Sequence, residues 1–163
     1  MAIAGVEQPV SIQINETLRL RRYEGTADFA LGWYQDEALV YLVDGVRRIY
    51  SRETLYGMYG YLDQRGELYF IETLENGAYV PIGDVTFCRE DMPIVIGVPE
   101  YRGRGIGRQV IRCLMDRGRQ LGFERLGVRE IYDFNTASIR CFTGCGFSPV
   151  ERIEKGWRYE AKL

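Results

Sequence analysis

The stretch Ile94-Val95-Ile96-Gly97-Val98-Pro99-Glu100-Tyr101-Arg102-Gly103-Arg104-Gly105-Ile106-Gly107-Arg108 decides how the rest of the chain is interpreted. Its first part is apolar and β-branched, which predicts a strand that ends near Pro99. A loop dense in glycine and arginine follows, and helical periodicity then runs from Gly105 to about Leu121. Glycine lets a backbone approach a ligand closely, and the N–H groups and dipole of a helix N-terminus favour an anion. Strand, loop and helix together predict a diphosphate-binding site.

The composition is that of one globular domain, residues 1–163. The chain is 46% hydrophobic and 27% charged, which allows a sizeable core. No apolar run approaches the ~20 residues of a membrane span, and residues 1–13 show no secretion signal. The four cysteines lack metal-site spacing and histidine is absent, which removes His-based triads and the common zinc sites. We expect a cytoplasmic protein without a metal site.

The charge is unevenly distributed along the chain. Residues 1–100 carry 16 Asp/Glu against 8 Lys/Arg, and residues 101–163 carry 7 against 13. The basic part suits an anionic cofactor, and the acidic part suits a cationic second substrate or is simply solvated surface. Because the basic residues gather around one phosphate-loop pattern, nucleic acid is disfavoured as a partner.

The other patterns predict an antiparallel meander before the opening stretch, and a strand, a short helix and a hairpin after it. Strands are expected over residues 10–22, 68–73, 78–88, 125–131, 150–153 and 157–163, with a tight turn at Asn76-Gly77. Helices are expected from a cap at Thr26-Ala27-Asp28 through Trp33-Tyr34, after Ser51, and over residues 136–145, whereas residues 35–48 show no clean periodicity. Strand, helix and strand from Ile94 to Ile131 imply a right-handed crossover between nearly parallel strands.

Two common nucleotide-binding motifs do not fit the glycines. A dinucleotide fingerprint needs G-x-G-x-x-G inside a βαβ repeat, but Gly103, Gly105 and Gly107 follow G-x-G-x-G after a meander. A Walker loop needs Gly-Lys-Ser/Thr, which this stretch lacks. The diphosphate must belong to another kind of ligand.

Arg102-x-x-Gly105-x-Gly107 resembles the acyl-CoA-binding motif of the GNAT superfamily of N-acetyltransferases. A second motif of that family is matched downstream by Asn135-x-Ala137-Ser138, Phe142 and Gly144-Cys145-Gly146-Phe147. The resemblance covers nearly the whole chain and implies an α/β (α+β) three-layer fold. That fold has a central mixed, mostly antiparallel sheet of about seven strands, about four flanking helices, and a splay at the two central parallel strands.

The resemblance also implies which residues bind acetyl-CoA. The backbone of Ile96, Gly97 and Val98 would hydrogen-bond the pantetheine arm. Asn135 would contact it from the following strand, and Phe142 would line the site. The diphosphate would be held by the loop residues Arg102, Gly103, Arg104, Gly105, Ile106, Gly107 and Arg108. Arg104 and Arg112 either meet the 3′-phosphate or face water.

The transfer chemistry needs a group that removes a proton from the amine, whose pKa is near ~10. A carboxylate can do this directly or through water, and backbone N–H groups can stabilise the oxyanion. The strand Ile94–Val98 lacks the acid that some family members place there. Asp91 is the first choice for the base because it lies closest in sequence to that strand, ahead of Glu90 and Asp84.

The leaving thiolate needs a hydrogen-bond donor. Many relatives place a tyrosine where this chain has Phe142, which cannot donate. Ser138, on the first turn of the same helix, is the expected substitute, as in family branches with a serine there. Its alternative role is helix capping, and Tyr132 is a more distant alternative donor.

We therefore expect an N-acetyltransferase that moves an acetyl group from acetyl-CoA directly to a primary amine. The aromatic N-terminal part, together with Asp36, Glu37 and Asp44, would suit a cationic acceptor. An aminoglycoside, polyamine, amino acid or protein N-terminus stays open, as does a homodimer. The alternative is an acyl-CoA-binding sensor or interaction module without catalysis. Neither a metal nor a membrane is expected to take part.

Overall fold

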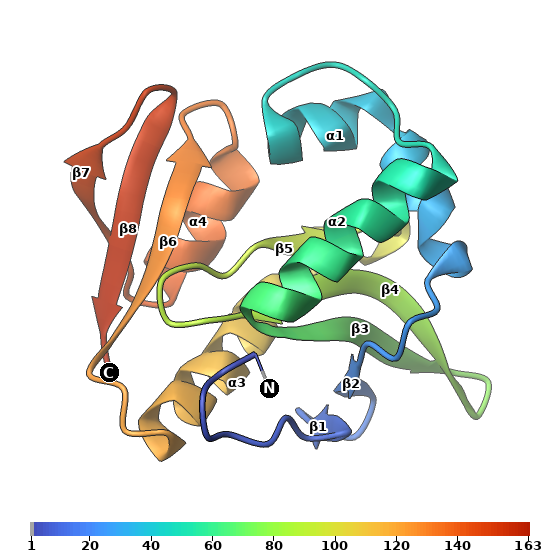
Figure 1. Cartoon of the computed structure of the whole chain (residues 1–163), viewed down its shortest axis with the longest axis horizontal. Helices are drawn as coiled ribbons and strands as arrows, with labels where there is room; N and C mark the ends of the chain where they lie inside the picture. Colours follow the sequence, from blue (N-terminus) through green and yellow to red (C-terminus); the bar gives the residue numbers. More distant parts are fainter. Residues whose placement is uncertain (1) are drawn as a thin grey trace. The chain divides into compact units, whose positions relative to one another are not determined.

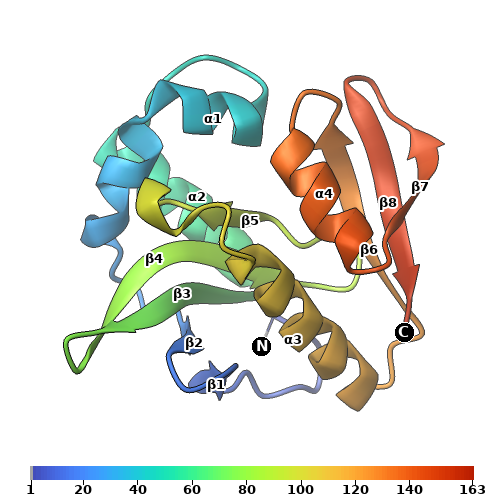
Figure 2. The ribbon, with the colours of Figure 1, turned by 180° about the vertical axis from the view of Figure 1, so that it is seen from behind.

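The computed structural model describes residues 2–163 (Figures 1 and 2). They form two compact units, which are described separately. The first unit comprises the residues up to Thr86 and Ile94–Arg102, and the second comprises Phe87–Pro93 and Gly103–Leu163. The described residues contain eight strands, four α-helices and two 3-10 helices. The predicted α/β fold with mostly antiparallel strands is confirmed, and the single-domain organisation stays a prediction.

The first unit is built on a five-stranded sheet with the order β1-β2-β3-β4-β5. Asn76 and Gly77 join β3 to β4, and both have positive φ, 48° and 80°. A two-residue hairpin turn of this kind requires positive φ, so the hairpin predicted from Asn-Gly is confirmed. The strands are β1 (Ser11–Gln13), β2 (Leu18–Arg22), β3 (Glu67–Glu75), β4 (Ala78–Phe87) and β5 (Ile94–Ile96).

Three helices precede β3 in this unit: the 3-10 helix η1 (Asp28–Gln35), α1 (Glu37–Asp44) and α2 (Arg52–Arg65). Helix α2 crosses one face of the sheet (Figure 1), where Leu55 and Tyr59 are fully buried and belong to one core cluster with Phe70. The Ser51 side chain accepts from the Thr54 N–H, which confirms the predicted start of α2.

Two predictions for this region were wrong. Asp36 caps the helix α1, which the irregular pattern of residues 35–48 did not indicate. The cap predicted at Thr26-Ala27-Asp28 does not form, because η1 begins after Ala27 without a side-chain hydrogen bond. Asp28 accepts instead from Arg52 and from the Tyr56 hydroxyl. Those bonds hold the start of η1 to α2.

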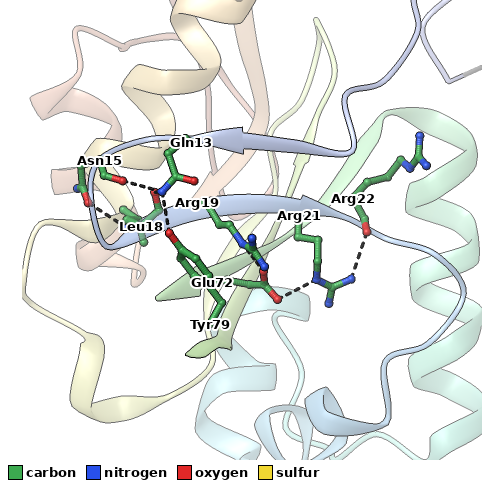
Figure 3. A network of polar contacts seen from close by, with 8 residues as sticks. All are labelled: Gln13, Asn15, Leu18, Arg19, Arg21, Arg22, Glu72 and Tyr79. Atoms are coloured by element: carbon green, nitrogen blue, oxygen red, sulfur yellow. Dashed lines mark hydrogen bonds and ion pairs between the residues drawn. The ribbon is translucent and has the colours of Figure 1, made fainter. Parts of the chain in front are cut away.

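A buried carboxylate connects β2 to β3 (Figure 3). Glu72 is 4% exposed, and its two oxygens accept from Arg19 and Arg21 at 2.8 Å each. The Arg19 guanidinium also lies 3.8 Å from the centre of the Tyr79 ring. Two cations satisfy one buried anion here, so a charged group can lie on the sheet face.

The second unit is built on a three-stranded antiparallel sheet with the order β6-β8-β7. Its strands are β6 (Arg125–Tyr132), β7 (Ser148–Arg152) and β8 (Gly156–Lys162), and its helices are α3 (Ile106–Gln120) and α4 (Thr136–Gly144). Helix α4 lies along one face of this sheet (Figure 2). The predicted helix and strand order after Gly105 is confirmed.

The strands hydrogen-bond as two sheets, where the sequence predicts one. The outer edge of β6 is occupied by the segment Phe87–Pro93: the Gly127 N–H donates to the Arg89 carbonyl at 2.9 Å. The Arg129 N–H donates to Asp91 Oδ1 at 3.0 Å. These bonds use the donors that a further strand would need. The parallel relation of β5 to β6 stays a prediction.

Helix α3 is amphipathic, as its sequence predicts. Val110, Ile111 and Leu114 are fully buried on one face, while arginines occupy other positions. Gly122 follows with φ of 79°, a conformation that commonly ends a helix. Among the helices of residues 2–163, none has the length and apolar character that crossing a bilayer would take.

Candidate active site

The loop before α3 has a backbone suited to an anion. Gly103 and Gly105 have φ of 71° and 77°, in the left-handed region that favours glycine. A β-carbon at either position would meet no atom within 4 Å. Both glycines and Arg104 between them are exposed. Successive N–H groups in such a loop can converge on an anion.

The N-terminus of α3 has no side-chain cap. Its N-cap is Gly105, whereas side chains of Asp36, Ser51 and Asn135 cap α1, α2 and α4. The Gln109 N–H donates to the Gly105 carbonyl. Helix geometry leaves the N–H groups of the first helical residues, those before Gln109, without an intrahelical acceptor. Exposed loop glycines and uncapped N–H groups together fit a phosphate-bearing ligand.

Gly107, in the first turn of α3, packs against α4. A β-carbon there would lie 3.0 Å from Cys141 Sγ, so even an alanine would require the cysteine side chain to shift. Cys141 and Cys145 were expected to face the core, but both are only half-buried. Their place is beside α3: Cys145 Sγ lies 3.7 Å from the Arg108 carbonyl oxygen.

Two arginines of α3 lie at the C-terminus of α4. A β-carbon on Gly144 would be 2.8 Å from Arg108 Nε. One turn further along α3, Arg112 donates to the Gly144 carbonyl at 3.5 Å. Cations at a helix C-terminus interact favourably with its dipole. Arg108 was predicted to hold the diphosphate, and in this structure its side chain packs on α4.

Arg102 contacts the backbone of its own unit. Its N–H donates to the Pro99 carbonyl within the 3-10 helix η2 (Pro99–Tyr101). Its side chain donates to the Ile96 carbonyl at 2.8 Å and to the Gly97 carbonyl at 3.3 Å. The motif arginine therefore supports the end of β5, a role that the sequence pattern did not predict.

Strand β5 ends in a bulge. The N–H groups of Gly97 and Val98 both donate to the Ile82 carbonyl, at 2.8 and 3.1 Å, which is the two-against-one pattern of a β-bulge. Gly83 is opposite Ile96, and alternation of the ladder orients the Ile96 backbone groups away from β4. Of the three residues predicted to bind pantetheine, Ile96 presents its backbone to the outer edge of β5.

The side chain of Trp33 packs directly on this bulge. A β-carbon on Gly97 would lie 2.3 Å from the indole ring. Trp33 belongs to η1, and the sequence predicted a short helix through Trp33-Tyr34 but not the contact of Trp33 with Gly97. The glycine inside a strand was the one available signal, because it often marks a close approach of another group.

Asp84 lies on β4, opposite Val95 of β5. It is 2% exposed, and the hydroxyls of Tyr34 and Tyr59 donate to its Oδ2 at 2.7 and 2.8 Å. Burial raises the pKa of this carboxyl to about 6, against the effect of the two hydrogen bonds. The tyrosine partners come from η1 and α2 and could not be identified from the sequence.

Asp91, the predicted base, contacts two backbone N–H groups. Its Oδ1 accepts from Met92 at 3.1 Å and from Arg129 at 3.0 Å. Burial raises its pKa, while the hydrogen bond from Arg129 opposes that shift. These contacts hold the segment Phe87–Pro93 against β6, and they account for the position of Asp91 without a catalytic role. Glu90 lies next to it, with its carbonyl near Gly127.

The second motif forms the start and end of α4. The Asn135 side chain accepts from the Ser138 N–H at 3.2 Å, so Asn135 is the cap. Ser138 does not cap the helix, and its side chain is half-buried in the first turn. Gly146, with φ of 93°, ends the motif. Phe147 then packs edge-to-face on the buried Phe142, with ring centres 5.2 Å apart.

Two of the three acidic residues expected at the acceptor site have structural partners. Asp36 accepts from the Ala38 and Leu39 N–H groups. Asp44 accepts from Arg48 at 2.9 Å and from the Tyr50 hydroxyl at 2.8 Å. Glu37 lies in the first turn of α1, where a negative charge suits the helix dipole. These contacts partly offset the negative charge predicted for this region.

Residues 28–147 match the model of the acetyltransferase (GNAT) family. The chain therefore belongs to the GNAT acetyltransferase family. It is an acyltransferase, and acetyl-CoA is its cosubstrate. No curated protein matches the sequence. Within residues 2–163, no group of three or more Cys, Asp or Glu side chains could hold a metal ion.

Solved structures of acetyltransferases share the fold. Spermidine N-acetyltransferase from Vibrio cholerae, in complex with CoA and spermine, has a TM-score of 0.69 and 19% identity, over 91% of this chain and 96% of that one. An acetyltransferase from Salmonella typhimurium that modifies the N-terminal serine of L7/L12 has a TM-score of 0.70 and 18% identity, over 94% and 99%. AAC(6')-Ib in complex with paromomycin and acetyl-CoA has a TM-score of 0.69 and 14% identity, over 90% of this chain and 94% of that one.

Proposed function

We propose that this protein transfers the acetyl group of acetyl-CoA to a primary amine of a cationic acceptor. The observation that carries the proposal is the uncapped N-terminus of α3 behind two exposed glycines with positive φ. This is the backbone that a diphosphate requires. A cytoplasmic location belongs to the proposal, and the four free cysteines fit a reducing compartment.

In this proposal the diphosphate is bound by the backbone of Gly103, Arg104, Gly105, Ile106 and Gly107. Arg102 holds the end of β5 by donating to the Ile96 and Gly97 carbonyls. Arg108 and Arg112 supply positive charge along α3. The Ile96 N–H offers a hydrogen bond to the pantetheine arm, while the Ile96 carbonyl accepts from Arg102. Asn135 and Phe142 complete the proposed acetyl-CoA site. Asn135 caps the N-terminus of α4, and Phe142 lies on the buried face of that helix.

Bound acetyl-CoA supplies an activated thioester. The acceptor ammonium must lose a proton before its lone pair can attack the carbonyl carbon. We assign that proton to Asp91, because burial raises the pKa of this carboxyl and so makes its carboxylate a stronger base than an exposed one. As the C–S bond breaks, the Ser138 hydroxyl donates a hydrogen bond to the departing thiolate.

Direct transfer is favoured over an acetyl-cysteine intermediate. Burial raises the pKa of Cys113 and of Cys141 to about 11, and it also raises those of Cys88 and Cys145. At neutral pH these thiols are protonated, and the thiol is a far weaker nucleophile than the thiolate.

The acceptor class is proposed from the proteins of the same fold. Their named ligands and targets include an aminoglycoside, spermine and a protein N-terminus, all of which carry primary amines. Within the first unit, the Phe29 ring is exposed and packs edge-to-face with the buried Trp33, with ring centres 5.8 Å apart. Aromatic faces of this kind can contact an ammonium group.

The test is a thiol-release screen with acetyl-CoA against paromomycin, ribostamycin, spermidine, spermine and a peptide with an N-terminal serine. Gly105→Glu should abolish acetyl-CoA binding, because it places a carboxylate and a strained φ at the phosphate loop. Gly122→Glu is the matched control: it has the same φ range, at the other end of α3, and should still bind. Binding by wild type without thiol release for any amine would favour the sensor. Equal binding by both variants would refute the loop assignment.

A further inference from the structure

The first unit contains a buried carboxylate that the proposed transfer does not use. Asp84 accepts two hydroxyl hydrogen bonds on one oxygen, from Tyr34 of η1 and from Tyr59 of α2. One side chain of β4 is thereby tied to both helices. Because burial of an ionisable group is costly unless it is hydrogen-bonded, an apolar residue would serve a purely packed core better.

The surroundings of Asp84 contain tyrosines and apolar groups. Tyr50 stacks on Tyr34 with ring centres 5.0 Å apart, and Tyr23 packs against Tyr59 at 5.8 Å. From β5 the facing residue is Val95. Burial raises the pKa of Tyr34 and of Tyr59 above the usual 10.0. In this cluster, Asp84 is therefore the group that changes charge near pH 6.

Tyr34 connects this carboxylate to the bulge of β5. Its hydroxyl is held by Asp84, and its carbonyl accepts from the Tyr50 N–H at 2.9 Å. The preceding residue is Trp33, whose indole lies on Gly97. A shift of Tyr34 would therefore move the ring that covers the bulge. Tyr59 has the same bond to Asp84 but lies on a different helix.

We propose that Asp84 is a positioning residue, which acts through Tyr34 to keep Trp33 packed on Gly97 and so sets the shape of β5 for acetyl-CoA. The proposal rests on the proposed function, because the backbone of Ile96, the residue before the bulge at Gly97, is assigned there to the pantetheine arm. Tyr34 and Tyr59 make matched bonds to one oxygen, but only Tyr34 adjoins Trp33. The two hydroxyls can thus separate positioning from packing.

The first experiment measures tryptophan fluorescence in a Trp157→Phe protein, in which Trp33 is the one remaining tryptophan. Trp33 fluorescence should change with a midpoint at about pH 6, where Asp84 ionises. Asp84→Asn should remove the transition. Tyr34→Phe should also remove it, whereas Tyr59→Phe should keep it. A transition that persists in Asp84→Asn or in Tyr34→Phe would overturn the proposal.

The second experiment measures acetyl-CoA affinity by calorimetry. Tyr34→Phe should weaken binding about tenfold, and Tyr59→Phe should change it less than about twofold. Equal losses in both variants would show a packing effect and overturn the proposal. If Asp84→Asn does not fold, the comparison of Tyr34→Phe with Tyr59→Phe still tests the proposal. Absence of acetyl-CoA binding by wild type would refute the proposed function, and the fluorescence experiment would still test the link from Asp84 to Trp33.

Discussion

The indole of Trp33 lies so close to the Gly97 backbone that a β-carbon there would be 2.3 Å from the ring. Two segments about 60 residues apart in sequence therefore meet at the point where β5 bulges. An added β-carbon at Gly97 would overpack this contact, which forces side chains from their rotamers or shifts the backbone. The contact explains why the strand carries a glycine.

Gly97→Ala should destabilise the protein by about 1–3 kcal/mol, measured by urea unfolding. Trp33→Leu in the same chain should recover part of that loss, because the two residues share one contact. Gly57→Ala is the control, since its β-carbon would meet nothing within 4 Å in the middle of α2. It should be neutral or stabilising. Additive losses in the double variant would contradict the contact.

Asp84 predicts a specific pH dependence of stability. Its folded pKa of about 6 lies above the ordinary 3.8, so the folded state binds the proton more tightly than the unfolded state. The contribution of Asp84 is fully present below about pH 4 and is lost as the pH rises through 6. Between those values wild type should lose about 3 kcal/mol of unfolding free energy relative to Asp84→Asn. A pH-independent difference between the two proteins would contradict the assignment.

Asp91 can be tested by two substitutions with different consequences. Asp91→Asn retains an oxygen for the Met92 and Arg129 N–H groups, so it should melt close to wild type. If Asp91 is the base, that variant should lose about 100-fold or more in kcat. Asp91→Ala should lose stability as well, by about 1–3 kcal/mol, because buried donors are left unpaired. Full activity in Asp91→Asn would leave the residue with a structural role only.

The Glu72 network predicts a stability effect without an effect on acetyl-CoA. Glu72→Gln leaves Arg19 and Arg21 with a neutral partner. Because both arginines are partly exposed, the loss should be about 1–2 kcal/mol, less than for a fully buried pair. Glu24→Gln removes the exposed pair with Arg22 and should cost less than about 0.5 kcal/mol. If Glu72→Gln and Glu24→Gln lose similar unfolding free energies in urea, the role of burial is contradicted.

The sequence predicted the parts of the fold that local chemistry determines. Ser51 is a cap, and Asn76-Gly77 is a turn, because a few neighbouring atoms decide those conformations. The helix α1 was missed although Asp36 and Gly45 flank it as cap residues. Its apolar residues have no clear period, and the two cap residues are its strongest local signal.

The parts that could not be predicted depend on contacts between distant segments. Neither the bonds from Tyr34 and Tyr59 to Asp84 nor the contact of Trp33 with Gly97 follows from spacing. Arg102 shows the same limit: a motif identified the residue, but the bonds to Ile96 and Gly97 required the fold. The backbone of the phosphate loop was predictable because glycine itself permits its conformation.

Titration of ¹⁵N-labelled protein with acetyl-CoA tests the central claim most directly, by following the backbone amide resonances. The largest shift changes should belong to Gly103, Gly105 and Gly107, with smaller changes at Ile96. Gly122, which has a similar φ beyond the other end of α3, should stay in place. Acetyl-CoA binding that moves other amides and leaves the three loop glycines unchanged would contradict the account.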